Sequence, residues 1–231
     1  MSVQNVAAEG DVSANDWKNF IHLTKDELAY VNEHRYEAIF KPGEIMIKQG
    51  SPASNALFLL SGMAKVYMEG IRGRNFIMSI AKPGRLIIGP GAYVTSRHTY
   101  TVSAITKVNA CFISFEVFRH LVKVNGAFAE SMLEDISAKS LRSHARMVSL
   151  AQKKMPGRLA EALLYFSGEV FMSDEFDMIL SRQELGEMTN MAKESVVRIF
   201  RELEESGIIE FTTSKIKILD KEKLISLSDS V

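Results

Sequence analysis

The chain has 231 residues, of which 46% are hydrophobic, and its 28 Lys and Arg residues balance its 28 Asp and Glu residues. This composition predicts a folded core and excludes a disordered chain. No apolar run reaches the ~18 residues of a membrane span, and Cys111 alone cannot form a disulfide or a multi-cysteine metal site within the chain. Residues 1–16 lack the charged and apolar regions of a secretory signal, so we expect a cytoplasmic protein with no membrane contact.

Residues 15–40 are predicted to form one or two short helices. The segment "LTKDELAYV" offers Thr24 as an N-cap, with Glu27 three residues later, which is the spacing of a capping box.

From Phe40 to Phe115, short apolar segments alternate with turn signals rich in Gly and Pro. Several segments show the period-two alternation of strands, and their spacing is typical of an all-β barrel or sandwich. The predicted strands are "EIMIKQ", "ALFLLS", "AKVYME", "NFIMSIA", "RLIIG", "TYTVSAIT" and "NACFISF".

After Phe115 the pattern becomes helical. "FEVFRHLVKV" predicts a short helix, and Asn125 opens a long run without proline until Pro156. Apolar and small residues in this run follow the alternating spacing of a coiled coil. They are Ala129, Leu133, Ile136, Ser140, Ser143, Met147 and Leu150. Because so long a helix needs a partner along its length, we expect it to join two copies of the chain; packing on its own β domain is the alternative.

The C-terminal part contains the clearest motif. A helix from "RLAEALLYFSGEVFM", a polar loop "SDEFD" and a short strand "MILS" lead to Ser181, which with Glu184 forms a second predicted capping box. The helix Arg182–Thr189 should bury Leu185 and Met188, with Gly186 permitting a close approach and Asn190 a left-handed turn. A second helix follows from about Ala192 to Ser206, then a hairpin from "IIEF" and "KIKIL". This order predicts a winged helix-turn-helix.

The second helix carries charged residues at its start. Residues near the N-terminus of such a helix reach base edges in DNA. Arg can bind guanine in two places, Glu can accept from the cytosine amine, and Arg198 lies one turn after Glu194, close enough for an ion pair. We predict DNA contacts by Ser181, Arg182, Lys193, Glu194, Ser195, Arg198 and Arg201. Against this, residues 152–231 hold 11 basic and 15 acidic side chains, a balance of −4, whereas DNA-binding domains are usually basic.

The segment "LSRQELGEMTNMAKESVVRIFRELEESGII" resembles the helix-turn-helix of the CRP/FNR family of bacterial transcription regulators. "KPGEIMIKQGSPASNALFLLSGMAKVYMEG" is similar to the family's cyclic-nucleotide-binding-type β-roll, and the long helix looks like its dimerisation helix. In the family, a Glu and an Arg at the positions of Glu194 and Arg198 read G·C pairs of a palindrome, and the cyclic-AMP branch has a base-reading Arg where this chain has Lys193. Ala192 departs from the usual N-cap Ser or Thr.

The segment "IIGPGAYVTSRHTYTVSA" departs from the cyclic-AMP branch. That branch binds the ribose with a Glu after Gly and the phosphate with an Arg before Ser. Here Pro90 follows Gly89, and His98-Thr99 stands about where Arg-Ser would be; Arg97 could substitute only with a shift of register. These changes argue against cyclic AMP, and the lone Cys111 argues against an iron–sulfur cluster.

Haem remains an alternative, with His98 and either His144 or Met147 as axial ligands, as do a small apolar or weakly acidic ligand and no ligand at all. The candidate effector pocket comprises Gly89, Arg97, His98, Thr99, Ser143, His144 and Met147.

The expected fold is α+β in three parts. Residues 1–124 form N-terminal helices and a β-roll of jelly-roll type, residues 125–153 a dimerisation helix, and residues 154–231 a winged helix-turn-helix. The expected partners are a double-stranded DNA operator, a second copy of the chain, RNA polymerase and an unidentified effector. A signalling module whose helix-turn-helix contacts only protein is the alternative, and nothing predicts an enzyme or a metal site.

Overall fold

The computed structural model describes residues 5–6 and 17–230. The main division between its two compact units falls between Lys139 and Ser140. Most of the N-terminal segment examined for a secretory signal lies outside the described residues. No helix in the described part of the chain is long and apolar enough to cross a membrane.

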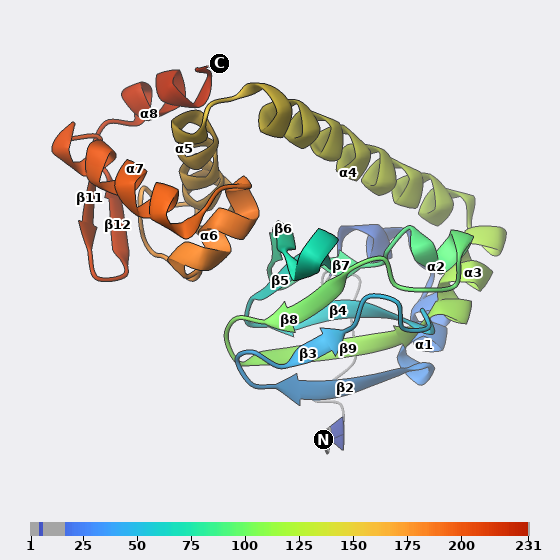
Figure 1. Cartoon of the computed structure of the whole chain (residues 1–231). Helices are drawn as coiled ribbons and strands as arrows, with labels where there is room; N and C mark the ends of the chain where they lie inside the picture. The colour runs from blue at the N-terminus through green and yellow to red at the C-terminus, as the bar shows by residue number, and fades with distance from the viewer. Residues whose placement is uncertain (1–4, 7–16, 231) are drawn as a thin grey trace. The chain divides into compact units, whose positions relative to one another are not determined.

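The first unit is built around a β-sandwich (Figure 1). One sheet has the order β1-β2-β9-β4-β7 and the other β3-β8-β5-β6. The strands are β1 (Asn5–Val6), β2 (Arg35–Phe40), β3 (Ile45–Ile47), β4 (Asn55–Ser61), β5 (Ala64–Glu69), β6 (Asn75–Ala81), β7 (Leu86–Ile87), β8 (Thr101–Ala104) and β9 (Val108–Ser114). Each of the seven predicted segments overlaps one of these strands, so the β prediction is confirmed.

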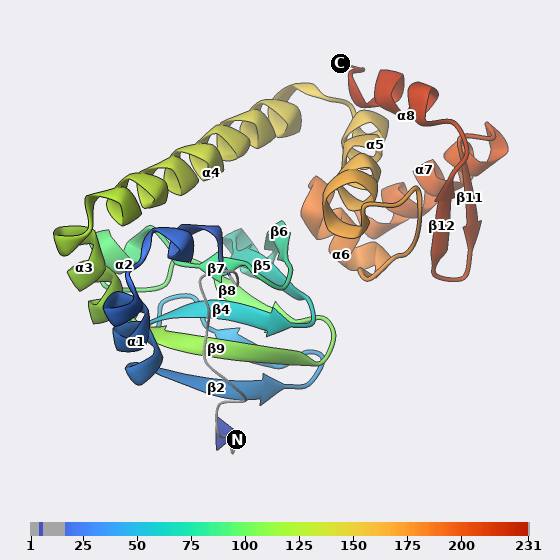
Figure 2. The same cartoon turned by 180° about the vertical axis from the view of Figure 1, so that it is seen from behind.

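Short helices complete this unit. They are η1 (Lys18–His22), α1 (Lys25–Glu33), η2 (Ile71–Gly73), α2 (Gly91–Val94) and α3 (Phe115–Val124). Both views show α1 and α3 at the same end of the sandwich (Figures 1 and 2). The Thr24–Glu27 capping box is present.

The central strands β4 and β9 are buried on both faces. Leu57 and Phe112 face the core between the two sheets, whereas Phe58 and Ile113 face a second core under the helices. A strand covered on both sides needs apolar residues throughout, which explains the runs "ALFLL" and "ACFI".

One prediction for this unit was wrong. Residues 35–40 form β2, which pairs with β9, instead of continuing the helix. The helical region ends at His34, and Ala38 and Phe40 then alternate into the core between the sheets. Tertiary packing therefore decides the conformation of this segment.

A long helix, α4 (Gly126–Gln152), crosses the division between the units. Asn125 caps it, because its Oδ1 accepts a hydrogen bond of 2.9 Å from the Phe128 N–H. The predicted long helical run is confirmed.

The second unit contains α5 (Met155–Tyr165), the π-helix η3 (Phe166–Phe171), β10 (Glu175–Asp177), α6 (Arg182–Thr189), α7 (Lys193–Glu205), β11 (Ile209–Thr212), β12 (Lys215–Ile218) and α8 (Lys221–Ser228). Its small sheet has the order β10-β12-β11. The hairpin prediction is confirmed.

Two features of the second unit were not predicted correctly. The strand before α6 is Glu175–Asp177 and not "MILS", because Phe176 is buried and pairs with Ile216 of β12. Helix α8 was missed; the Asp220 side chain caps it, and its buried Leu224 is the apolar signal.

Candidate nucleic-acid interface

Helix α6 begins at the predicted capping box. The Ser181 N–H donates to Glu184 Oε2 over 2.8 Å, and the Glu184 N–H donates to Ser181 Oγ over 3.2 Å. These bonds satisfy backbone donors that have no partner within the helix. Leu185 and Met188 are buried as predicted, so the start and the inner face of α6 are fixed locally.

The turn between α6 and α7 follows from two residues. Asn190 has φ 53° and ψ 55°, the left-handed conformation that Asn tolerates better than most residues. A Cβ at Gly186 would lie 2.5 Å from the Met191 carbonyl oxygen. Gly186 therefore allows the backbone of the turn, at Met191, to pack closely against α6. This close packing fixes where α7 begins.

Helix α7 has one buried and one exposed face. Val196, Ile199, Phe200 and Leu203 are buried. Lys193, Glu194, Arg198 and Arg201 are exposed, whereas the predicted contact Ser195 is half-buried. Ala192 stands at the N-cap without a side-chain hydrogen bond, as the sequence indicated.

The exposed face of α7 changes charge along its length. Its N-terminal part carries Lys193, Arg198 and Arg201 with one acid, Glu194, whereas Glu202, Glu204 and Glu205 follow. The expected ion pair of Arg198 with Glu194 is not the one that forms. Arg198 Nη1 lies 2.5 Å from Glu202 Oε1 instead, and both side chains are about half exposed. A polyanion would be attracted to the N-terminal part and repelled by the end of the helix.

Arg182, the first residue of α6, makes a contact that sequence reasoning missed. Its guanidinium carbon lies 4.0 Å from the centre of the Phe200 ring on α7 and 4.3 Å from that of Phe211 on β11. Burial lowers the pKa of the Arg182 guanidinium, but arginine stays charged in proteins. The sequence does hold a signal for this contact, because Arg182, Phe200 and Phe211 lie on three elements that a winged helix-turn-helix brings together.

The first unit contains the other four candidate residues. Gly89 is buried, and a Cβ there would lie 3.2 Å from the Tyr100 ring. Arg97 is exposed and donates from Nη1 to the Gly50 carbonyl oxygen over 2.7 Å. Thr99 is half-buried.

His98 is the buried polar group of this region. It is 8% exposed, and its Nδ1 has no hydrogen-bond partner among the described residues. Burial lowers its pKa below the ordinary value. A neutral imidazole in this place cannot replace the permanent charge of an arginine toward a phosphate.

A hollow of about 300 Å³ lies beside His98 in the sandwich. Its wall includes Tyr36 and Phe112, whose rings stack with centres 4.9 Å apart, together with Ile47 and Asn55. These two aromatic residues were not among the predicted site residues.

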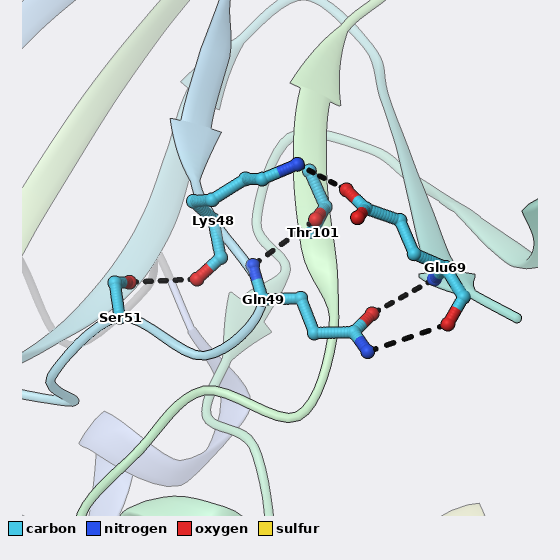
Figure 3. Close-up of polar contacts among 5 residues, drawn as sticks. All are labelled: Lys48, Gln49, Ser51, Glu69 and Thr101. Carbon is cyan, nitrogen blue, oxygen red and sulfur yellow. Dashed lines mark hydrogen bonds and ion pairs between the residues drawn. The ribbon is translucent and has the colours of Figure 1, made fainter. Parts of the chain in front are cut away.

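A polar network closes one end of β3 (Figure 3). The Gln49 side-chain amide accepts from the Glu69 N–H over 2.8 Å and donates to the Glu69 carbonyl over 3.4 Å, while the Gln49 N–H donates to Thr101 Oγ1. Lys48 forms an ion pair with Glu69, so its charge is already compensated. The network ties the ends of β3 and β5 to β8.

The remaining three candidates lie on α4. Ser143, His144 and Met147 are exposed on the part of the helix that belongs to the second unit.

Two protein-family models match the chain: a cyclic nucleotide-binding domain over residues 37–125 and a Crp-like helix-turn-helix domain over residues 157–227. The transcriptional activator protein FnrA of Stutzerimonas stutzeri is 25% identical over 192 residues, which are 81% of this chain and 78% of that protein. The cAMP-activated global transcriptional regulator CRP of Salmonella typhimurium is 24% identical over 186 residues, 79% of this chain and 87% of that protein. The solved structure of FixK2 from Bradyrhizobium japonicum superposes with a TM-score of 0.77 at 18% identity, covering 85% of this chain and 98% of that one, a likeness in fold.

Proposed function

The chain belongs to the CRP/FNR family of DNA-binding transcription regulators and is not an enzyme. We propose that it binds a palindromic DNA operator as a homodimer, and that an effector other than cyclic AMP controls this binding. The observation that carries this proposal is the exposed, basic N-terminal part of α7, where Lys193 and Arg198 stand free of the core.

Arg198 and Glu194 are the proposed base readers. An arginine fork matches the two acceptors of guanine in the major groove, and a carboxylate matches the amine of the paired cytosine. Lys193, in the first turn of α7, would reach a neighbouring base. Ser181, Ser195 and Arg201 would contact phosphates, which set the register of the protein on the duplex; Arg182 belongs to the same set of DNA-binding residues.

Homodimerisation is supported by exposed apolar side chains on α4. Leu133 is 65% exposed, Ile136 54% and Met147 58%, and all three belong to the coiled-coil pattern. A second copy that covered this pattern would bury it and relate the two α7 helices by a two-fold axis. The two helices would then enter successive major grooves, about 34 Å apart.

The chain has three proposed functional parts: residues 1–124 sense the effector, residues 125–153 form the dimer, and residues 154–231 bind DNA. We expect the regulator to act in the cytoplasm and to contact RNA polymerase at its promoters.

The effector pocket is proposed around Gly89, Arg97, His98 and Thr99 in the first unit, and Ser143, His144 and Met147 on α4 are proposed as further effector-binding residues. Cyclic AMP is disfavoured, because Pro90 has no side-chain acceptor for a ribose hydroxyl and a neutral His98 cannot neutralise a phosphate. A small apolar or weakly acidic ligand, which needs neither a ribose acceptor nor a phosphate partner, is proposed instead. Haem is the alternative effector, with His98, His144 and Met147 as candidate axial ligands.

Selection of duplexes from random-sequence DNA, followed by sedimentation of the complex, tests the proposal. We expect an enriched palindrome that binds two chains. If no sequence is enriched, the alternative is favoured, in which the chain is a signalling module whose helix-turn-helix contacts protein. The excess of acidic residues after Gln152 is compatible with such contacts. Calorimetric titration with cyclic AMP and a Soret absorbance spectrum test the two named effectors.

A further inference from the structure

Arg182 joins three elements of the DNA-binding domain through its guanidinium group. The group belongs to the first residue of α6 and lies over Phe200 of α7 and Phe211 of β11. The two rings are themselves 5.7 Å apart, at an angle of 56°. We call these three side chains the Arg182 stack.

No carboxylate among the described residues forms an ion pair with Arg182, although its guanidinium is half-buried. The faces of two aromatic rings therefore supply the negative electrostatic potential that compensates its charge. Arginine suits this position better than lysine, because its broad guanidinium is more weakly hydrated than an ammonium and can contact two rings at once.

The two rings differ in how firmly they are held. Phe200 is buried in the core of the unit, whereas Phe211 is half-buried on β11, the first strand of the hairpin. The hairpin is also attached through β10, through the segment that follows α7 and through its buried Ile209 and Ile216, and Phe211 itself contacts Phe200 of α7. The contact from Arg182 adds a link between the start of α6 and the side of the hairpin that faces α7.

We propose that Arg182 is a positioning residue that holds the hairpin at a set angle to α7, in addition to any phosphate contact that its guanidinium makes. Its effect on DNA binding rests on the proposed function, since a set angle allows α7 and the hairpin to contact one duplex together. Without the stack, the hairpin would sample several angles, and ordering it would oppose binding.

A phosphate-only role predicts something different. A lysine would then serve nearly as well as an arginine, because a phosphate is held by either cation, and the ring of Phe211 would be irrelevant to Arg182. Loss of a phosphate contact would also reduce the salt dependence of binding by about one unit of slope.

Hydrogen exchange of the hairpin amides, without DNA, separates the two roles. We compare wild type with Arg182→Lys, Phe211→Leu and the double variant, and use Arg142→Lys, an exposed arginine on α4, as the matched control. We expect exchange in β11 and β12 to be roughly tenfold faster in each single variant, no faster still in the double variant, and unchanged in the control. Unchanged exchange in Arg182→Lys, or additive effects in the double variant, would overturn the proposal.

The second readout is binding to the duplex selected by the wild-type chain, over a range of salt concentrations. Arg182→Lys and Phe211→Leu should each weaken binding about tenfold with an unchanged salt slope, since no phosphate contact is lost. Full affinity in both variants would contradict the positioning role. If the wild type selects no duplex while the exchange result holds, the Arg182 stack stands and the proposed function fails.

Discussion

Arg198 pairs with Glu202, one turn toward the C-terminus of α7, and not with Glu194, one turn toward the N-terminus. The guanidinium is thus held toward the acidic end of the helix. If Arg198 reads a base as proposed, the base edge has to replace the Glu202 carboxylate, and the ion pair would then compete with DNA.

Glu202→Gln should strengthen operator binding. The substitution removes the competing carboxylate and one negative charge from the edge of the interface. Because exposed ion pairs contribute only about 0.2–1 kcal/mol, the gain should be a few-fold. Fluorescence anisotropy with labelled operator measures it, and Glu222→Gln on α8 is the control for net charge. Weaker binding by Glu202→Gln would mean that the pair orients Arg198 for its base.

Gly186→Ala should destabilise the second unit. The new Cβ would lie 2.5 Å from the Met191 carbonyl oxygen, closer than real contacts allow, so the turn must move. Overpacking of this kind costs about 1–3 kcal/mol. Gly168→Ala is the matched control, because a Cβ at Gly168 meets nothing within 4 Å. Urea unfolding should show a lower midpoint for Gly186→Ala only; equal midpoints would contradict the packing of the turn.

Ala192→Ser should stabilise α7. Ala192 has φ −71° and ψ 150°, the extended conformation of an N-cap, but no side chain to accept from the helix. A serine would supply the missing acceptor and add about 1 kcal/mol to the free energy of unfolding. Ser181→Ala, which removes the cap of α6, should have the opposite effect of similar size. Thermal unfolding measures both effects. An unfolding temperature of Ala192→Ser that is not above that of the wild type would show that a serine at this position does not cap α7.

His98 should make the first unit less stable in mild acid. Burial lowers its pKa in the folded state below the ordinary 6.5. As the pH falls below 6.5, the unfolded chain gains a proton at His98 that the folded chain does not, so the free energy of unfolding decreases. His98→Asn should lose this part of the pH dependence. Urea unfolding at pH 7.5 and pH 5.5 provides the comparison, and an equal loss of stability in both proteins would refute it.

Much of the fold could be predicted because local signals and tertiary packing agree. The capping boxes at Thr24 and Ser181 and the left-handed Asn190 act over a few residues, and the apolar run of β4 is a signal within the strand itself. The helix-turn-helix was predictable for the same reason.

Features that depend on distant partners could not be predicted. Residues 35–40 become a strand only because β9 is available to pair with them. Glu194 and Glu202 are each four residues from Arg198, so the sequence spacing does not tell which of them forms the ion pair. Side-chain geometry decides in favour of Glu202. The stacking of Arg182 on Phe211 needs the hairpin to return beside α6.

The base-reading role of Arg198 on the exposed face of α7 underlies the proposed function. Its most direct test is binding of wild type and Arg198→Ala to the selected operator and to each singly substituted operator at one salt concentration. We predict that Arg198→Ala weakens binding to the operator by about 1–3 kcal/mol and no longer discriminates at one G·C pair in each half-site, while discriminating at the others. Retained discrimination at every position would contradict the claim.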